Sequence, residues 1–428
     1  MSLLGIGLLL LVLVVLGVPI AIALGFVALV AMIAGPGGVG SIPNAALVMF
    51  DGATSFPLIA IPLFILAGAI MNASGISRRL IAFASACVGF IRGGLSMVTI
   101  SASLFFAEIS GSAVADVAAL GSILIPAMKK KGYSKAFAAA VTSSSATLAV
   151  IIPPSIPMII YGVMSGSSIV ELFVAGIIPG VLGGGLMMFV AYLLARKHDF
   201  PREEAFRMQR VWETFKDAGW ALVLPVIILG GIFSGWVTAT EGAGLAVVAA
   251  IFIGGVIYRE LDATELRRAM LEGGQQTAVV MLLVAASALL GDYLTEVRVP
   301  QRVATGIMEL TQARWAILLL LNGFFLVIGL FLHSAAAIIL VVPIVMPLVQ
   351  AAGIDPVHFG LIVTLNLGIG QQTPPVASVL VTACSVAKAD IWEVSKVNVY
   401  FVAVLVTMLV LVTYVPVVPM ALVELFYR

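Results

Sequence analysis

The sequence predicts an all-α polytopic membrane protein of the transporter type, built from two inverted repeats. Of its 428 residues, 62% are hydrophobic and 10% are charged, whereas soluble domains are about half apolar and about a quarter charged. Apolar runs long enough to cross a bilayer recur along the chain. A Pro-Pro pair interrupts one such run in each half, at Pro153-Pro154 and at Pro374-Pro375.

Composition also excludes several classes of protein. The net charge of +1 gives no basis for nucleic-acid binding. The two cysteines, Cys87 and Cys384, are typical of small buried hydrophobic residues and cannot form a disulfide framework. The first apolar run, residues 3–34, lacks a basic leading region and is too long for a signal-peptide core, so we expect it to be retained membrane structure.

The apolar runs divide into single spans and hairpins. The candidate spans are residues 3–16, 18–34, 56–73, 134–163, 170–195, 220–233, 238–258, 278–293, 358–386 and 394–417. Residues 96–128 and 315–349 are too long for one span, and each has small or polar residues at its middle: Ser110-Gly111-Ser112 and His333-Ser334. This pattern predicts two re-entrant helical hairpins, whose tips need protein or water around them at membrane depth.

A polar linker at residues 196–217 separates a first repeat, residues 1–195, from a second repeat, residues 218–428. A shift of 221 residues places Pro126 on Pro347, Gly132 on Gly353, and the first Pro-Pro pair on the second. The residues between these anchors match poorly. The sequence therefore predicts a structural repeat with little sequence identity.

The distribution of basic residues predicts the orientation of the chain. With the linker in the cytoplasm, 18 of the 22 Lys and Arg residues lie inside, as the positive-inside rule requires. This threading opens the first hairpin to the cytoplasm and the second to the outside, so the repeats are inverted. The residues left outside are Arg298, Arg302, Arg314 and Arg428.

The two broken helices, within residues 134–163 and 358–386, are the predicted transport site. Proline removes a backbone donor and clashes with the preceding turn, so each Pro-Pro pair should unwind several residues and free carbonyl oxygens. Carbonyls and Ser/Thr hydroxyls suit a small hard cation such as sodium, while half-helix N-termini favour an anion. The alternative is that the prolines only kink structural helices. Breaks at corresponding positions of both halves favour the transport site.

Other functions remain open from the residues alone. Glu108 and Asp116 flank the first tip and His333 occupies the second, so a stand-alone ion exchanger or proton antiporter could use these three. Glu241 is a further candidate acid near the start of a span. A non-transporting scaffold is the third class. The chain has no Walker A sequence, metal-spaced cluster or catalytic constellation, so we expect no enzyme and no ATP hydrolysis.

The sequence resembles the large permease (M) subunit of TRAP transporters, the tripartite ATP-independent periplasmic family. The segments that carry the resemblance are GVPIA at 17–21, SFPLIAIPLFILAG at 55–68, ISGSAVAD at 109–116, GSILIPAM at 121–128, IIPPSIP at 151–157 and GIDPVHFG at 353–360. They occur in the family's order, and the similarity runs along the whole chain.

The resemblance implies a sodium-driven importer of organic acids in the inner membrane of a bacterium or archaeon. It implies a small membrane subunit (Q type), a periplasmic substrate-binding protein (P type) and an elevator movement of the hairpin domain. It also implies two sodium sites, each where a hairpin tip meets its broken helix. The residues implied are Ser110, Gly111, Ser112 and Ser145 for the first site, and Gly370, Thr373 and Pro374 for the second.

The chain departs from the family pattern along the expected cavity. His333 stands where an acidic residue is expected, Gln371-Gln372 replaces an apolar pair, and Ala149-Val150 replaces a Gly-Pro. A C4-dicarboxylate is therefore only the default substrate, with sugar acids and keto acids also open. The predicted substrate-binding residues are Ser155, His333, Ser334, Gln371 and Gln372.

Overall fold

The computed structural model describes residues 3–35, 38–110, 113–202, 205–374 and 376–428, and at residues 3, 4, 11, 15 and 106–110 it describes only the backbone. Every regular element within these residues is helical. The elements of the first half are α1 (Leu3–Val15), α2 (Ile20–Ile33), η1 (Gly38–Ser41), α3 (Ile42–Ala53), η2 (Phe56–Ile59), α4 (Ala60–Ala73), α5 (Ile76–Val88), α6 (Gly94–Ser110), α7 (Ala113–Lys130), α8 (Lys135–Ala149), α9 (Ile156–Ser165) and α10 (Ile169–Lys197). Those of the second half are α11 (Met208–Phe233), α12 (Ala239–Phe252), η3 (Ile253–Ile257), α13 (Ala263–Glu296), α14 (Val299–Leu310), α15 (Arg314–Gly329), α16 (Ser334–Ala351), α17 (Pro356–Gly370), α18 (Ser378–Ala387), α19 (Ile391–Tyr414) and α20 (Val417–Tyr427).

Helix bounds repeat along the chain. Both ends of α7 shift by 221 residues onto the ends of α16, and both ends of α8 shift by 221 onto the ends of α17. The same shift brings α6 to α15, α9 to α18 and α10 to α19 within a few residues. The predicted repeat is therefore confirmed at the level of individual helices, although few of the residues match.

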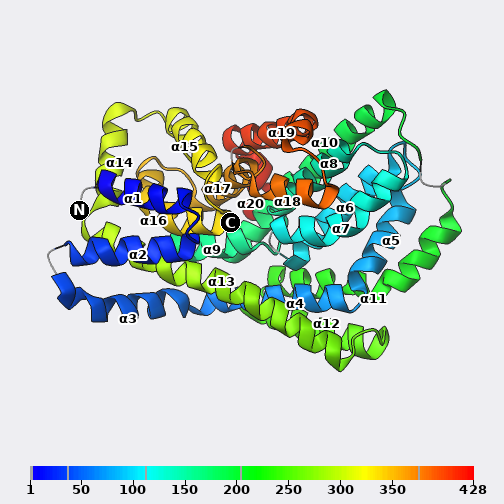
Figure 1. Ribbon diagram of the computed structural model, residues 1–428, viewed down its shortest axis with the longest axis horizontal. Helices are drawn as coiled ribbons and strands as arrows, with labels where there is room; N and C mark the ends of the chain where they lie inside the picture. Colours follow the sequence, from blue (N-terminus) through cyan, green and yellow to red (C-terminus); the bar gives the residue numbers. More distant parts are fainter. Residues whose placement is uncertain (1–2, 36–37, 111–112, 203–204, 375) are drawn as a thin grey trace.

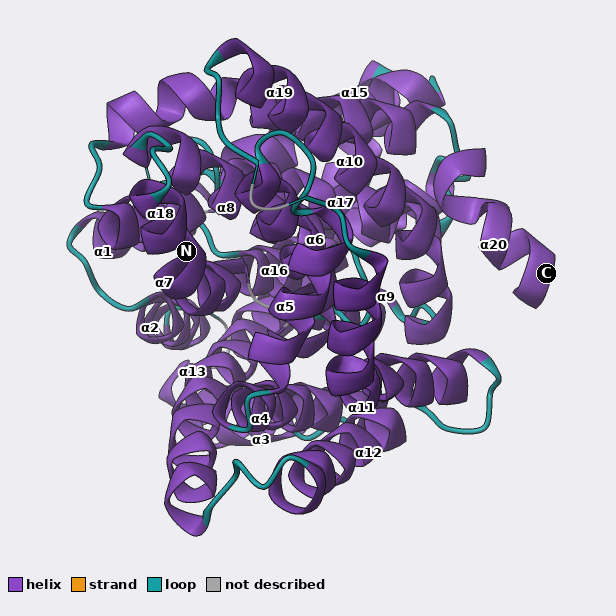
Figure 2. Cartoon of the chain, turned by 90° about the vertical axis from the view of Figure 1, so that its right-hand side faces the viewer, coloured by secondary structure: helices purple, strands orange, loops and turns teal. Residues whose placement is uncertain are grey.

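The molecule has two layers, visible at the bottom and the top of Figures 1 and 2. The first, here named the α4/α13 layer, consists of α2, α3, α4, α11, α12 and α13. The 34-residue helix α13 crosses it diagonally and packs on α2, α3 and α4. The second, named the broken-helix layer, consists of α6–α10 and α15–α19.

The halves interlock within the broken-helix layer. Helix α7 packs on α8 of its own half and on α18 of the other half. Helix α16 correspondingly packs on α17 of its own half and on α9 of the other half. In Figure 1, α6 and α7 lie toward one end of the molecule, and α15 and α16 toward the opposite end. Each hairpin therefore contacts both broken helices, and the two sets of contacts correspond.

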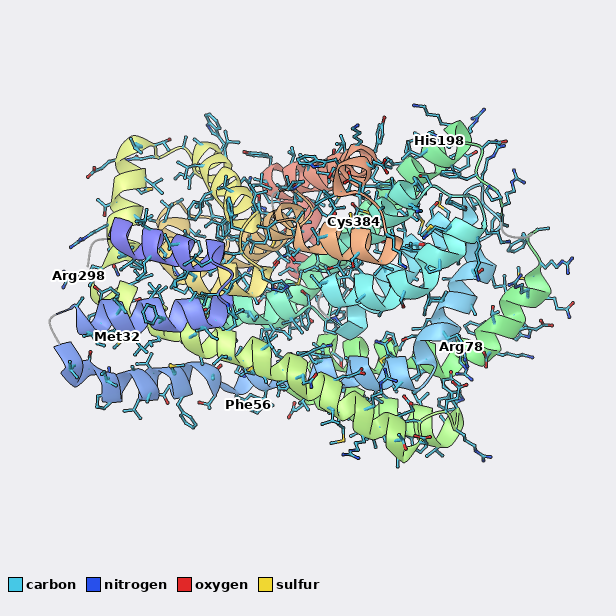
Figure 3. All side chains as sticks on the ribbon, viewed as in Figure 1. Met32, Phe56, Arg78, His198, Arg298 and Cys384 are labelled. Carbon is cyan, nitrogen blue, oxygen red and sulfur yellow. The ribbon has the colours of Figure 1, made fainter. Side chains whose placement is uncertain are left out.

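Seven helices in the described residues are long and apolar enough to span a bilayer: η2 with α4, α10, α11, α12 with η3, α13, α16 and α19. Arg78 and His198 lie at one end of the long axis and Arg298 at the other, as Figure 3 shows. This separation agrees with the predicted threading, in which Arg78 is cytoplasmic and Arg298 is external. In that threading the long axis would lie along the membrane normal.

Two polar regions are more helical than hydropathy indicates. The helix α10 runs to Lys197 and α11 begins at Met208, so the non-helical connection is shorter than the polar segment at residues 196–217. Glu241 caps a helix: its carboxylate accepts hydrogen bonds from the backbone N–H and hydroxyl of Thr238, at 2.8 and 2.9 Å, in a capping box at the start of α12. This exposed acid is thus structural.

Candidate functional site

The first break separates α8 from α9. Residues 150–155 are not helical, and the peptide bond between Pro153 and Pro154 is cis. Ser155 begins the second half-helix, since its buried hydroxyl accepts a long hydrogen bond of 3.5 Å from the N–H of Met158. The hydroxyl of Ser155, which was predicted to contact substrate, therefore acts as the N-cap of α9. The substrate role of Ser155 stays a prediction.

Glycines of α10 make room for the first break. A Cβ atom at Gly176 would lie 2.0 Å from the carbonyl oxygen of Ile151, and one at Gly180 would lie 2.5 Å from the side chain of Ile152. Only glycine allows backbone to approach this closely. The glycine spacing of four residues on α10 was a sequence signal for this contact, and the sequence reasoning missed it.

The second break separates α17 from α18 and lies against the second hairpin. A Cβ atom at Gly370 would lie 2.4 Å from the carbonyl carbon of Gly329, the last residue of α15. The ends of α15 and α17 are therefore in backbone-to-backbone contact. Of the residues predicted for the second sodium site, Gly370 is buried while Thr373 and Pro374 are partly buried, and Pro375 lies outside the described residues.

A side-chain hydrogen bond also joins the second tip to the second break. The Nε2 group of Gln371 donates to the hydroxyl of Ser334, the first residue of α16, and both side chains are buried. The Oε1 atom of Gln371 accepts from Ser378 at 3.4 Å. His333 occupies the N-cap position of α16 and is partly buried. The structure thus brings together three of the five predicted substrate-binding residues.

Gln372 connects the second break to the first broken helix. Its Nε2 group donates to the main-chain oxygen of Ser143 at 2.8 Å and to the hydroxyl of Thr147 at 2.5 Å. Its Oε1 atom accepts from Nδ2 of Asn398 in α19 at 3.0 Å. All four side chains are buried. Both amide hydrogens of Gln372 are therefore used within the protein, and its predicted substrate contact stays a prediction.

Other buried amides are also hydrogen-bonded to one another or to hydroxyls. Ser144 donates to Oδ1 of Asn398 at 2.7 Å. Asn366 in α17 donates from Nδ2 to Oδ1 of Asn322 at 2.6 Å, and Asn322 donates to the hydroxyl of Thr413 at 3.2 Å. Sequence reasoning missed the roles of Asn322 and Asn398. The available signal was an amide within an otherwise apolar span, which is costly in a membrane unless it is paired.

Asn366 carries an acceptor without a donor. Its Oδ1 atom is buried and accepts no hydrogen bond from any residue that the structure describes. It lies one helical turn before Gly370, at the end of α17 where the helix breaks. Because buried acceptors are nearly always satisfied, such an oxygen is available to a cation or an ordered water.

The residues predicted for the first sodium site are described only in part. Ser145 is buried, shares a 2.9 Å hydrogen bond with Ser103 of α6, and donates to the main-chain oxygen of Thr142 at 3.1 Å. The side chains of Glu108 and Ser110, and the residues Gly111 and Ser112, lie outside the described part of the chain. Among the described residues, no group of three or more His, Cys, Asp or Glu could hold a metal ion.

A polar cavity of about 390 Å³ opens between the two layers, lined by α4, α7 and α13. Asp116, in the first turn of α7, is 3% exposed and faces this cavity from the broken-helix layer. From α13 the lining includes Arg268 and Glu272, which form a 2.9 Å ion pair. The cavity therefore places charged groups where the first hairpin meets the α4/α13 layer.

Comparison with known proteins decides the family. Residues 8–418 match the family described as "Tripartite ATP-independent periplasmic transporter, DctM component". The chain belongs to this family. Its two broken helices, two hairpins and repeat are therefore those of a TRAP large permease component, and the sequence resemblance is confirmed.

Curated relatives agree with this membership. The chain is 42% identical over 413 residues to the "Isethionate TRAP transporter permease protein DctMQ" of Oleidesulfovibrio alaskensis, covering 95% of this chain and 64% of that protein. It is 38% identical over 382 residues to the "C4-dicarboxylate TRAP transporter large permease protein DctM" of Pseudomonas aeruginosa, covering 89% and 90%. Both of these relatives are named as transporter permeases, which agrees with the expectation that the chain is not an enzyme.

A solved structure shares the fold. The YdaH transporter of Alcanivorax borkumensis superimposes with a TM-score of 0.64 at 15% sequence identity, covering 88% of each chain. At this identity the likeness concerns the fold alone. The shared fold agrees with the all-helical architecture described above.

Proposed function

We propose that this chain is the large membrane subunit of a sodium-coupled importer of a small organic anion. The observation that carries the proposal is the buried polar junction at which Gln372 of the second break meets Ser143 and Thr147 of the first broken helix. A permease needs a polar site at membrane depth, and broken helices in corresponding positions are its usual construction. An exchanger based on Glu108, Asp116 and His333 is the alternative, and the side chain of Glu108 lies outside the described residues.

The substrate proposed is an anion with a carboxylate or a similar acidic group. Isethionate and C4-dicarboxylates, the substrates in the names of the two relatives, are both anionic. The half-helices α9 and α18 begin at the breaks, so their N-termini provide positive dipole ends there. Ser334 and Gln371, together at the second break, supply the hydrogen-bonding groups that would fix an acidic group in place.

Sodium coupling is proposed from the oxygen atoms of the second break. The free Oδ1 of Asn366, the hydroxyl of Thr373 and the carbonyl oxygens at the end of α17 are hard ligands of the kind that small cations prefer. Sodium would be transported together with the substrate. We infer an elevator movement of the broken-helix layer, because the two layers meet at a polar cavity that includes Asp116.

The proposed complex has three components in the inner membrane and periplasm: this subunit, a small Q-type membrane subunit and a P-type binding protein. The family description names a tripartite periplasmic system. The chain spans 64% of the length of the relative named DctMQ.

Reconstitution tests the proposal. The chain and its Q subunit in proteoliposomes should accumulate isethionate or succinate only with the cognate binding protein and an inward sodium gradient. Replacing sodium with potassium at equal ionic strength is the control for a general salt effect. Uptake at an unchanged rate without sodium, or without the binding protein, would contradict the proposal.

A further inference from the structure

An apolar groove lies on the broken-helix layer, between α10 and α19. Its volume is about 510 Å³, within the range of about 300–1,000 Å³ that is typical of ligand sites. Phe189 and Leu193 line it from α10, and Val399 and Tyr400 line it from α19. These four side chains are between 48% and 62% exposed. In a spanning protein, a groove of this kind faces acyl chains and not water.

The groove lies away from the packing surface of the α4/α13 layer. In Figures 1 and 2, α10 and α19 are at the top of the molecule, while α4, α12 and α13 are at the bottom. The helices α10 and α19 contact each other and α8 and α17. The groove is therefore on the outer side of the broken-helix layer, where the bilayer surrounds it.

One end of the groove is basic. Lys197, in the last turn of α10, is part of the lining and is exposed. Lys396 lies one turn before Tyr400 on the same face of α19 and is also exposed. Lys197 near the end of α10 lines the same groove as Val399 and Tyr400 in the first part of α19, so these two segments lie at the same end of the groove.

The charges of this end favour an anion. Among the residues that the structure describes, neither Lys197 nor Lys396 forms an ion pair with an acidic side chain. Glu393 lies one turn before Lys396 on α19, so one acidic group opposes the two lysines. The rest of the lining is apolar apart from Thr407 and the hydroxyl of Tyr400. An occupant therefore needs a long apolar part and a negative group at the cytoplasmic end.

We propose that this groove binds an anionic phospholipid of the cytoplasmic leaflet. An acyl chain would lie between Phe189 and Val399, and Lys197 and Lys396 would contact the phosphate-containing headgroup. Basic pockets between membrane helices on the cytoplasmic side bind anionic headgroups in this way. Tyr400 suits the boundary between headgroup and acyl chain, where aromatic rings concentrate. A helix of a partner subunit would have no use for two lysines directed at the headgroup level.

Lipid titration of the purified full chain tests the charge part of the proposal. Phosphatidylglycerol and phosphatidylcholine are added separately to delipidated protein in a zwitterionic detergent, and bound lipid is counted by native mass spectrometry. The ratio of phosphatidylglycerol binding to phosphatidylcholine binding should fall roughly 30-fold in the double variant Lys197→Gln with Lys396→Gln. This figure assumes that each lysine contributes about 1 kcal/mol. Arg196→Gln removes a neighbouring charge off the groove and should change the preference less than about twofold. An equal loss in Arg196→Gln would overturn the site.

A second variant tests the apolar part. Ala403 is exposed on the groove floor, so Ala403→Trp should block binding of both lipids, whereas Val181→Trp, at an exposed position of α10 outside the groove, should not. Glycerol phosphate without acyl chains should not compete. Lipid binding that survives Ala403→Trp overturns the proposal. Loss of the co-purifying Q subunit in that variant, with lipid binding unchanged, would instead identify the groove as a subunit interface.

Discussion

The side-chain amide of Gln372 donates a hydrogen bond to the main-chain oxygen of Ser143, at 2.8 Å, and thereby joins the broken helix of one half to that of the other. Both residues are buried. The same amide also reaches Thr147 of α8 and Asn398 of α19, so the second break is tied to one helix of each half. Changes at Gln372 should therefore affect the stability of the whole broken-helix layer.

The variant Gln372→Ala should be strongly destabilised. It leaves the Nδ2 group of Asn398 without its acceptor in a buried place, which costs about 1–3 kcal/mol. It also removes the bonds from Gln372 to Thr147 and to the main-chain oxygen of Ser143, which keep their bond to each other. Thermal unfolding of the detergent-purified protein should show a midpoint several degrees lower. Gln275→Ala, at an exposed position of α13, is the matched control and should leave the midpoint unchanged. Equal midpoints for the two variants would show that the bridge adds no stability.

Gly370→Ala should disrupt the contact between the second hairpin and the second break. The added Cβ would lie 2.4 Å from the carbonyl carbon of Gly329, and backbone cannot move away as a flexible side chain can. We expect the free energy of unfolding to fall by about 1–3 kcal/mol. Less folded protein should then be recovered in size-exclusion chromatography. Gly274→Ala, in α13 with no atom within 4 Å, should be neutral or stabilising. Normal recovery of Gly370→Ala would contradict the packing described.

Thr373→Ala tests the proposed sodium ligands. The hydroxyl of Thr373 donates to the main-chain oxygen of Ile369 at 3.1 Å, which leaves its oxygen able to accept a cation. The sodium concentration for half-maximal uptake should rise about tenfold, the effect expected for one lost ligand of about 1.4 kcal/mol. Thr382→Ala removes a hydroxyl with the same kind of backbone bond inside α18 and should not change it. An unchanged sodium requirement in Thr373→Ala would remove Thr373 from the site.

Acid should loosen the contact between α5 and the loop before α13 through Glu260. Hydrogen bonds from Arg79 hold the pKa of Glu260 below its ordinary value, although partial burial opposes this. The ion pair stabilises the fold fully at pH values above the ordinary pKa of the unfolded chain. This stabilisation is lost as the pH falls through the lowered pKa of the folded protein. Between roughly pH 5 and pH 3, the thermal unfolding midpoint of the unaltered chain should fall more steeply than that of Glu260→Gln. Glu272→Gln, which breaks an exposed pair, should keep the steep fall.

The sequence was sufficient for the features that depend on local sterics. The prolines at 153, 154 and 374 predicted the breaks because proline disrupts a helix wherever it stands, and the glycine and proline anchors predicted the repeat. The pairing of Gln372 with Ser143 could not be predicted, because it depends on how helices far apart in sequence pack. Hydropathy also missed the first turns of α13, since a helix can continue beyond the apolar segment that it carries.

The contacts between the halves also mean that the first broken helix is synthesised well before its hydrogen-bond partners. Ser143 precedes its partner Gln372 by 229 residues, and Ser144 precedes Asn398 by 254. At ribosomal rates of about 5–20 residues per second, the first broken helix waits roughly 10–50 s before these amides are made. The nascent first half must therefore remain in the bilayer with incomplete polar contacts, and a prematurely terminated chain would be a substrate for membrane quality-control proteases.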